Sequence, residues 1–265
     1  MQPEIVAYYQ RGGERDRLAA GDGRLEFLRT RDVLARVLPG PPASVLDVGG
    51  ATGVYAAPLA AEGYRVHVVD PLPEHAEASG RCPGVTASVG DARCLAAADA
   101  SVDAVLLLGP LYHLTAGAER VRVWREAARV VRPGGVVVAA TISRFASMLG
   151  GFVQGFLAEP AFVDIVRSDL ASGVHRNPDH RLDWFTTAYF AHPEEPPVEA
   201  SAAGLAVERV VAVEGPLWMT GRLDEVLADP ARTATMLELL RQVEAEPSLL
   251  GASAHLLTVA RRPSA

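Results

Sequence analysis

Lysine is absent from the 265-residue sequence, in which every basic residue is an arginine. Without lysine the chain has no P-loop lysine for a phosphate, no amine for a Schiff base and no lysine general base. Its 25 basic residues are outnumbered by 32 acidic ones, so the formal net charge is −7. Sequence-independent binding of nucleic acid needs a basic face, and this composition argues against it. We therefore expect no nucleic-acid partner.

Cysteine and long apolar runs are scarce as well. Cys82 and Cys94 make neither a disulfide framework nor a CxxC metal site, so we interpret them as reduced thiols. The first twenty residues contain no apolar core of signal-peptide length, and no stretch reaches the roughly 20 apolar residues of a membrane span. These absences predict a cytoplasmic protein with no membrane partner, and we expect a monomer or a homodimer.

Short β-branched runs alternate with helical patterns through the middle of the chain. The predicted strands are 44–48, 65–69, 85–89, 103–108, 136–141, 207–213 and 255–260. The predicted helices are 25–38, 55–62, 118–131 and 193–204. This rhythm predicts an α/β fold with a seven-stranded, mostly parallel sheet and helices on both of its faces.

Three segments depart from this rhythm. Residues 143–187 have the pattern of two helices followed by a polar loop, and we interpret them as a helical lid over the substrate. Residues 216–250 form a second predicted helical insertion. The polar, Gly-rich residues 1–24 are expected to form an arm that orders over a ligand. We expect residues 1–265 to make up a single domain.

The Gly-rich stretch after the first predicted strand carries most of the chemical information. The segment 45–53, VLDVGGATG, joins a strand to a helix. Small residues there let the backbone approach a ligand, and the start of a helix offers free N–H groups. A dinucleotide fold requires G-x-G-x-x-G, but counting from Gly49 places Val54 at the third glycine. This spacing disfavours a nicotinamide-dependent oxidoreductase.

At this stretch the chain resembles the class I S-adenosylmethionine-dependent methyltransferases of the small-molecule type. The first motif of that family is D/E-x-G-x-G-x-G, which is matched by Asp47, Gly49, Ala51 and Gly53, with Ala51 in place of the middle glycine. The run Arg132-Pro133-Gly134-Gly135 matches the turn that precedes the family's fifth strand. The resemblance covers residues 25–142 and 193–262. It implies a Rossmann-like fold, a methyltransferase domain over residues 1–265, and S-adenosylmethionine as cofactor with S-adenosylhomocysteine as product.

The resemblance also assigns residues to the cofactor. It places Asp70, at the end of the second strand, on the ribose hydroxyls and Asp91, at the end of the third, near the adenine amino group. Both are alternatively helix caps. In related enzymes an N-terminal helix meets the amino-acid end of the cofactor, which suggests Arg29, although a surface pair with Glu26 is the alternative. The cofactor-binding residues expected in this way are Asp47, Gly49, Gly50, Ala51, Gly53, Asp70, Pro71, Gly90, Asp91, Ala92, Leu108, Gly109, Tyr9 and Arg29.

The fourth predicted strand continues into Gly109-Pro110-Leu111-Tyr112-His113. Methyltransferases that act on adenine or on amides resemble [D/N/S]-P-P-[Y/F] here, and the glycine lacks the side chain that would hold the accepting nitrogen. Tyr112 and His113 are candidate catalytic residues, because an imidazole with a near-neutral pKa is able to take a proton from a hydroxyl or an amine. A structural histidine is the alternative.

The lid holds the polar cluster His175-Arg176-Asn177-Pro178-Asp179-His180-Arg181. We interpret His175 as a second candidate base, and Arg176 and His180 as groups that bind a carboxylate on the acceptor. A solvated loop is the alternative, and the intervening proline disfavours a metal site, so we expect no metal. Aromatic side chains that would line an acceptor pocket, or simply form the core of the lid, are Tyr8, Phe185, Tyr189 and Trp218.

Together these features predict methyl transfer from S-adenosylmethionine to a small molecule in secondary metabolism. O- or N-methylation of an aromatic or carboxylate-bearing acceptor, by direct in-line displacement, is favoured. One alternative is C-methylation of an electron-rich aromatic such as an indole. Another, of a different class, is a non-catalytic protein that binds S-adenosylmethionine.

Overall fold

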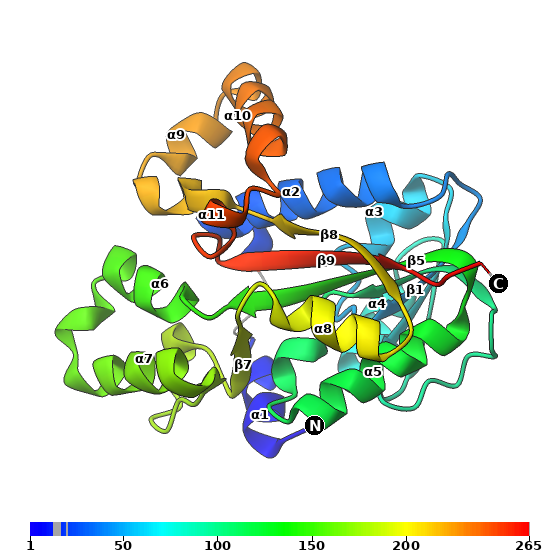
Figure 1. Cartoon of the computed structure of the whole chain (residues 1–265), viewed down its shortest axis with the longest axis horizontal. Coiled ribbons are helices and arrows are strands. Elements are labelled where there is room, and N and C mark those ends of the chain that lie inside the picture. Colours follow the sequence, from blue (N-terminus) through cyan, green and yellow to red (C-terminus); the bar gives the residue numbers. More distant parts are fainter. Residues whose placement is uncertain (13–16, 20, 265) are drawn as a thin grey trace. The chain divides into compact units, whose positions relative to one another are not determined.

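The structure is a computed structural model that describes residues 1–12, 17–19 and 21–264 (Figure 1). Its internal contacts divide the chain into two compact units. Unit 1 comprises Met1–Val33, Ile142–Glu194 and Val210–Leu257. Unit 2 comprises Leu34–Thr141, Glu195–Arg209 and Thr258–Ala265. Residues 13–16 and 20, which belong to the predicted N-terminal arm, lie outside the described residues. The single domain stays a prediction.

Unit 2 is built on a parallel sheet. Its strands are β1 (Ser44–Val48), β2 (Arg65–Asp70), β3 (Val85–Val89), β4 (Val102–Leu107) and most of β5 (Val131–Ser143), in the order β3-β2-β1-β4-β5. All four neighbouring pairs are parallel. Beyond β5 follow β9 (His255–Arg261) and then β8 (Ala206–Ala212). The predicted α/β fold with a mostly parallel sheet is confirmed.

One face of this sheet is covered by two helices that lie side by side, α5 (Gly117–Val130) and α8 (Glu195–Ala202). Successive side chains of a strand point to opposite faces, so Leu46 and Val48 of β1 lie on the same face. They share a buried cluster with Trp124 of α5 and Ala200 of α8. Burial of these apolar side chains is the main source of stability in this layer.

The opposite face carries α4 (Pro73–Gly80), which follows α3 (Ala56–Ala61) in the sequence. Asp47, Val68 and Ala87 are neighbours across β1, β2 and β3 and therefore point to one face. A Cβ atom on Gly80 of α4 would lie 3.6 Å from the Cβ of Ala87. Helices thus flank the sheet on both faces, and Asp47 points away from the α5 side.

The run 132–135, RPGG, lies inside β5 and does not precede it. Gly134 has φ +76°, and the pairing with β4 changes register between Val102 and Ala104. The amide of Gly134 donates to the carbonyl of Arg262, and the amide of Arg262 donates to Gly135. The expected turn is therefore a bulge whose free backbone groups are satisfied by the end of the chain.

Unit 1 is mainly helical. Its helices are α1 (Pro3–Gln10), most of α2 (Gly21–Val37), α6 (Ala146–Gln154), α7 (Pro160–Ser172), α9 (Leu223–Leu227), α10 (Pro230–Val243) and α11 (Pro247–Leu250). Two short strands, β6 (Val174–His175) and β7 (Ala188–Ala191), pair antiparallel, and β7 runs parallel to the last residues of β5. The described residues therefore form nine strands, and the expectations of seven strands and of a strand-free lid were wrong. A strand of two residues is too short to show a periodicity.

The N-terminal segment and the second insertion also differ in detail from the prediction. α1 forms within residues 1–24, where Ile5 is fully buried, and α2 begins at Gly21 instead of residue 25. The second insertion is helical as expected. A buried cluster joins α2 to α9 and α10 through Leu25, Leu223, Leu227, Met236 and Leu240. Among the described residues, no helix has both the length and the apolar character needed to cross a membrane.

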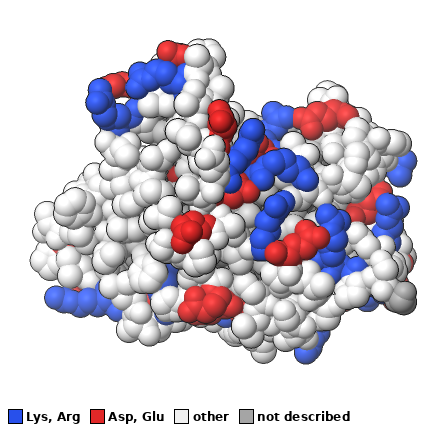
Figure 2. All heavy atoms as spheres, turned by 45° about the horizontal axis from the view of Figure 1, so that its top comes forward, with Lys and Arg blue, Asp and Glu red and all other residues white. Residues whose placement is uncertain are grey.

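Arginine side chains of unit 2 are paired with nearby carboxylates. Arg129 lies 2.7 Å from Asp99 and from Glu126, and Arg93 lies 2.6 Å from Asp91 and from Glu119. Basic and acidic side chains are interspersed on the face shown in Figure 2. The expectation of no nucleic-acid partner stays a prediction.

Candidate functional site

The loop after β1 is tightly turned. Gly49, Ala51 and Gly53 have φ of +73°, +47° and +87°. The amide of Gly49 donates to the carbonyl of Val69 at 2.7 Å, which fixes the loop to the end of β2. A left-handed conformation costs a residue with a Cβ atom roughly 1–2 kcal/mol, so Ala51 is strained where the family motif has glycine.

Close approach of two backbones explains the glycine at the end of β4. A Cβ atom on Gly109 would lie 2.9 Å from the carbonyl oxygen of Gly49. A Cβ atom on Gly49 would lie 3.0 Å from Cδ of Pro110. The loops after β1 and β4 are therefore in contact, and a side chain at position 109 would force them apart. The packing therefore leaves no room at position 109 for a side chain that would hold an amide nitrogen.

Asp47 is a buried acid without a partner. Its side chain is 1% exposed, and neither carboxyl oxygen has a hydrogen bond within the described part of the chain. Burial raises the pKa of this carboxyl, and the charge of Asp70 adds to the effect, so that the pKa is about 7. A Cβ atom on Gly50 would lie 2.6 Å from Oδ2 of Asp47. An acid held under a glycine loop in this way would be stabilised by a nearby cation.

Asp70 holds the same loop from the end of β2. Its Oδ2 accepts a hydrogen bond from the amide of Ala51 at 3.0 Å, and its Oδ1 accepts one from Leu72 at 3.0 Å. His75 Nδ1 lies 3.2 Å from Oδ1. A carboxylate offers about four lone-pair sites, so capacity is left for ribose hydroxyls. The hydrogen bond from Leu72 closes an i,i+2 turn at Asp70. Asp70 is therefore not the helix cap named as the alternative, because the N-cap of α4 is Leu72.

The end of β3 lies beside Asp70, since the amide of Gly90 donates to the carbonyl of Asp70 at 3.1 Å. Asp91 is half exposed and forms a two-point ion pair with Arg93. Nη2 of Arg93 lies 2.6 Å from Oδ2 of Asp91, and Nε lies 2.9 Å from Oδ1. These hydrogen bonds lower the pKa of Asp91 to about 2. Asp91 is therefore ionised at neutral pH, and its contact with adenine, like those of Pro71 and Ala92, stays a prediction.

Tyr112 and His113 lie on a 3-10 helix, η2 (Leu111–His113), directly after β4. The Tyr112 hydroxyl donates to the carbonyl of Leu108 at 3.2 Å. The Tyr112 and His113 rings meet edge to face with centroids 4.8 Å apart. Unit 2 therefore brings together the loop after β1, Asp70, Gly90 and Gly109. The catalytic roles of Tyr112 and His113 stay predictions, as does cofactor binding by Tyr9, which is half-buried in unit 1.

Arg29 does not have the role predicted from the resemblance. Its side chain is fully buried, with Nη1 2.6 Å from Asp32, Nη2 2.7 Å from Glu244 and Nε 3.1 Å from the carbonyl of Val213. Because the side chain is fully buried and each of its three guanidinium nitrogens has a partner inside unit 1, the assignment to the cofactor's carboxylate was wrong. The alternative partner, Glu26, was also wrong, since the i,i+3 pair is with Asp32.

His175 is likewise a structural residue. The ring is 1% exposed and stacks on Phe190 at 4.8 Å. Its Nδ1 lies 2.8 Å from Asp169 Oδ2, and its Nε2 lies 2.8 Å from the carbonyl of Trp184. With both nitrogens occupied, His175 has no free site for a substrate proton, and its assignment as a base was wrong.

His175→Gln should therefore change stability and leave cofactor affinity unaltered. Loss of one buried hydrogen bond, with Asp169 left under-satisfied, is expected to cost about 1–3 kcal/mol of unfolding free energy. Denaturant unfolding measures this, with the exposed His180→Gln as matched control. A variant of wild-type stability whose turnover is lost would restore the catalytic role.

The residues predicted to bind the acceptor differ in their surroundings. Tyr8 and Phe185 meet edge to face at 5.4 Å, and the Tyr189 hydroxyl accepts a hydrogen bond from Arg144 at 3.2 Å. Arg176 lies 3.9 Å from Glu4, and His180 is exposed. Substrate binding by these residues stays a prediction. Trp218 is 7% exposed and donates to the carbonyl of Ala252 at 2.9 Å, as a core residue would, and its role in substrate binding also stays a prediction.

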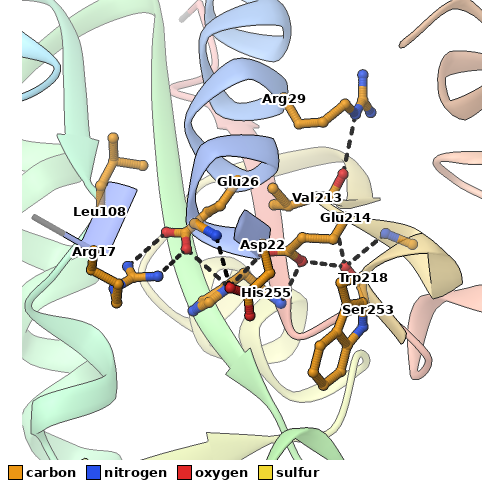
Figure 3. Close-up of polar contacts among 12 residues, drawn as sticks. Arg17, Asp22, Glu26, Arg29, Leu108, Val213, Glu214, Trp218, Ser253 and His255 are labelled. Carbon is orange, nitrogen blue, oxygen red and sulfur yellow. Dashed lines mark hydrogen bonds and ion pairs between the residues drawn. The ribbon is translucent and has the colours of Figure 1, made fainter. Parts of the chain in front are cut away.

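Sequence reasoning missed a polar cluster in unit 1 that consists of Glu26, Glu214 and His255 (Figure 3). Glu214 follows β8 and His255 begins β9. Their position at the ends of two strands was the available signal. Glu26 was considered only as a partner of Arg29.

Comparison with known proteins identifies the region that contains the unit 2 site. A family described as "Methyltransferase domain" matches residues 46–139. The ubiquinone biosynthesis O-methyltransferase of Methylocella silvestris is 38% identical, covering 38% of this chain and 40% of that protein. The demethylmenaquinone methyltransferase of Beutenbergia cavernae is 33% identical, covering 62% of this chain and 64% of that protein. The chain thus spans less than two thirds of the length of either relative.

A solved structure shows the same fold over most of the chain. The geranyl diphosphate C-methyltransferase of Streptomyces coelicolor A3(2), in complex with Mg²⁺, geranyl diphosphate and S-adenosyl-L-homocysteine, superposes with a TM-score of 0.54 at 14% identity. The match covers 90% of this chain and 81% of that one. At this identity the likeness concerns the fold alone.

These matches support the resemblance to the class I S-adenosylmethionine-dependent methyltransferases, whose methyl donor is S-adenosylmethionine. The matched region includes the loop after β1 and the ends of β2, β3 and β4. The residues present fit the cofactor: the buried, unpartnered carboxyl of Asp47 suits a cation, and the glycines at 49 and 109 leave the backbone accessible.

Proposed function

We propose that this chain, a member of the class I S-adenosylmethionine-dependent methyltransferases, transfers a methyl group to a small hydroxylated or amine-bearing acceptor. The observation that carries the proposal is the unpartnered carboxyl of Asp47 beneath the loop of residues 49–53. Asp47, Asp70 and Asp91 would hold the cofactor at the ends of β1, β2 and β3. S-adenosylmethionine supplies an activated methyl group, so the protein chiefly aligns and desolvates the reactants for in-line displacement.

O- or N-methylation is the favoured outcome. The named relatives include an O-methyltransferase of ubiquinone biosynthesis and a methyltransferase of demethylmenaquinone, which supports an aromatic acceptor. Gly109 offers no side chain to hold an amide nitrogen, which disfavours nucleobases and amides. Tyr112 and His113, directly after β4, are the groups proposed to position the acceptor or to take its proton. C-methylation is the alternative, supported by the name of the structural neighbour from Streptomyces.

The direct test measures turnover. Labelled S-adenosylmethionine is incubated with the protein and panels of phenols, catechols, carboxylic acids, amines and indoles, and transfer of the label is followed. Transfer to a phenol or an amine supports the proposal, and transfer to carbon supports the alternative. Stoichiometric binding of S-adenosylmethionine without transfer to any acceptor class would favour a non-catalytic binding protein.

Asp70 tests the cofactor site itself. Asp70→Asn replaces the proposed ribose acceptor and weakens the anchor of the amide of Ala51. We expect the Kd for S-adenosylhomocysteine in calorimetry to rise about 10-fold to 100-fold, since a hydrogen bond to a charged group is worth about 1.5–3 kcal/mol. The exposed Asp179→Asn is the control. Unaltered affinity in Asp70→Asn would remove Asp70 from the ribose role.

A further inference from the structure

Three ligand atoms that are suited to a divalent cation meet in unit 1. They come from Glu26 on α2, Glu214 in the segment after β8, and His255 at the start of β9 (Figure 3). One atom from each lies within 4.8 Å of the other two. His255 Nδ1 is the atom nearest both acids, at 2.7 Å from Glu214 Oε1 and 3.5 Å from Glu26 Oε2. The geometry points to a binding site for a first-row divalent metal ion, formed by these three side chains.

The distances match the size of such an ion. Bonds from Zn²⁺ to nitrogen and oxygen are about 2.0–2.2 Å long, so two ligands at a tetrahedral angle are roughly 3.4 Å apart. The two separations at His255 Nδ1 lie on either side of this value. All three ligand atoms lie within 4.8 Å of one another, so an ion would draw together those that are farther apart and separate His255 Nδ1 from Glu214 Oε1.

Glu214 is already oriented for this role. Its side chain is 2% exposed, and its Oε2 accepts hydrogen bonds from the Ser253 hydroxyl at 2.8 Å and from the amide of His255 at 3.0 Å. These contacts turn the other oxygen, Oε1, toward His255 Nδ1. The preceding residue, Val213, is held by Arg29 through its carbonyl. Supporting hydrogen bonds of this kind fix the direction of a metal ligand and are a general feature of metal sites.

Arg17 is a fourth charged group at this cluster. Arg17, which is about one-third exposed, pairs with both oxygens of Glu26. His255 Nδ1 lies between the carboxylates of Glu214 and Glu26. The charge of a divalent ion would be offset by these two carboxylates, with a neutral imidazole as the third ligand, and Arg17 would remain beside the ion as one excess positive charge. Arg17 is therefore a competitor of the ion, and this makes its removal an informative test.

The donor set selects the class of ion. One imidazole nitrogen with two carboxylates suits Zn²⁺, Fe²⁺, Co²⁺ or Mn²⁺, whereas Ca²⁺ and Mg²⁺ prefer sites made of oxygen alone. The ion would join α2 to the segment after β8 and to β9 within unit 1. Its binding would stabilise the folded chain in proportion to the logarithm of the free ion concentration above Kd.

Metal titration of the chelator-treated full-length protein tests the site independently of methyl transfer. We expect Co²⁺ to bind with one-to-one stoichiometry and to give visible d–d bands, Zn²⁺ to displace it, and Zn²⁺ to raise the Tm. Glu214→Gln and His255→Gln should each weaken binding at least about 10-fold. The exposed His180→Gln is the matched control for adventitious binding and should leave affinity unchanged.

The variant Arg17→Ala keeps all three proposed ligands and should change the metal affinity in the opposite direction. Removal of the competing guanidinium should tighten Zn²⁺ binding several-fold. The proposal is overturned if the wild-type protein binds no stoichiometric Co²⁺ or Zn²⁺, or if correctly folded Glu214→Gln binds as the wild type does. It is also overturned if Arg17→Ala weakens binding. Calorimetric binding of S-adenosylhomocysteine by the same samples reports separately on the cofactor site.

Discussion

Asp47→Asn is expected to stabilise the cofactor-free protein at pH 8 and to weaken cofactor binding. The pKa of Asp47 is about 7 in the folded chain because burial, assisted by Asp70, disfavours its charge. An unfolded chain has a value of about 3.9 for aspartate. Between these two pH values the folded state holds a proton that the unfolded state has released, so unfolding free energy falls as pH rises. The difference of about three units corresponds to roughly 4 kcal/mol at most above pH 7.

The measurement is urea unfolding of wild type and Asp47→Asn at pH 5 and pH 8. The wild type should lose stability relative to the variant between these values, by on the order of 2–4 kcal/mol. Other titrating groups cancel in this difference. Asp164→Asn, which alters an exposed aspartate, should track the wild type. A constant difference between wild type and Asp47→Asn at the two pH values would contradict the raised pKa.

Ionisation of Asp47 should also make cofactor affinity depend on pH, with affinity rising where the stability of the cofactor-free protein falls. A cationic sulfonium favours the ionised carboxyl, so wild-type affinity for S-adenosylmethionine should rise as pH increases through about 7. In Asp47→Asn this dependence should vanish and affinity should be lower at pH 8. Calorimetry at several pH values checks both effects. Equal affinities of the two proteins at pH 8 would remove Asp47 from the site.

Arg29→Ala should be severely destabilising. The guanidinium is fully buried between Asp32, Glu244 and the carbonyl of Val213. Removing one partner of a buried ion pair leaves an uncompensated charge and typically costs 3–5 kcal/mol. Glu244 is itself buried and would lose its hydrogen bond from Arg29 Nη2, at 2.7 Å. We expect a loss of unfolding free energy in this range, measured with denaturant.

The control is Arg24→Ala, which removes an exposed arginine from the same helix and should change stability by less than about 0.5 kcal/mol. Folded Arg29→Ala, measured at low temperature, should still bind S-adenosylhomocysteine with near wild-type affinity. A stable variant with impaired cofactor affinity would instead restore the role first predicted for Arg29.

The loop and strand ends that form the proposed cofactor site were predictable because their signals are local. Asp47, Asp70 and Asp91 each stand at the end of a β-branched run, and parallel strands bring such ends to one edge of a sheet. Glycine at 49 and 53 follows from turn geometry alone. Ala51 shows the limit of this reasoning, since the sequence did not reveal that an alanine adopts φ +47° there.

Roles that depend on long-range partners were not predictable. Arg29 and His175 are chemically suited to bind a carboxylate or a proton, and the sequence offers no sign that Glu244 and Asp169 take up those capacities. Arg29 and Glu244 are 215 positions apart. Strands β6 and β7 were missed for a related reason, because short strands are stabilised by their pairing and not by their own pattern.

By itself the sequence determined the α/β class, the positions of the main strands along the chain, the glycine loop with its acids, and the exclusion of lysine chemistry. These properties follow from periodicity, composition and motif spacing, which act over a few residues. Only the tertiary structure decided which polar side chains are available for chemistry. Burial and hydrogen-bond partners set that availability, and they turned Arg29 and His175 into structural residues, left Asp47 without a partner, and assembled Glu26, Glu214 and His255.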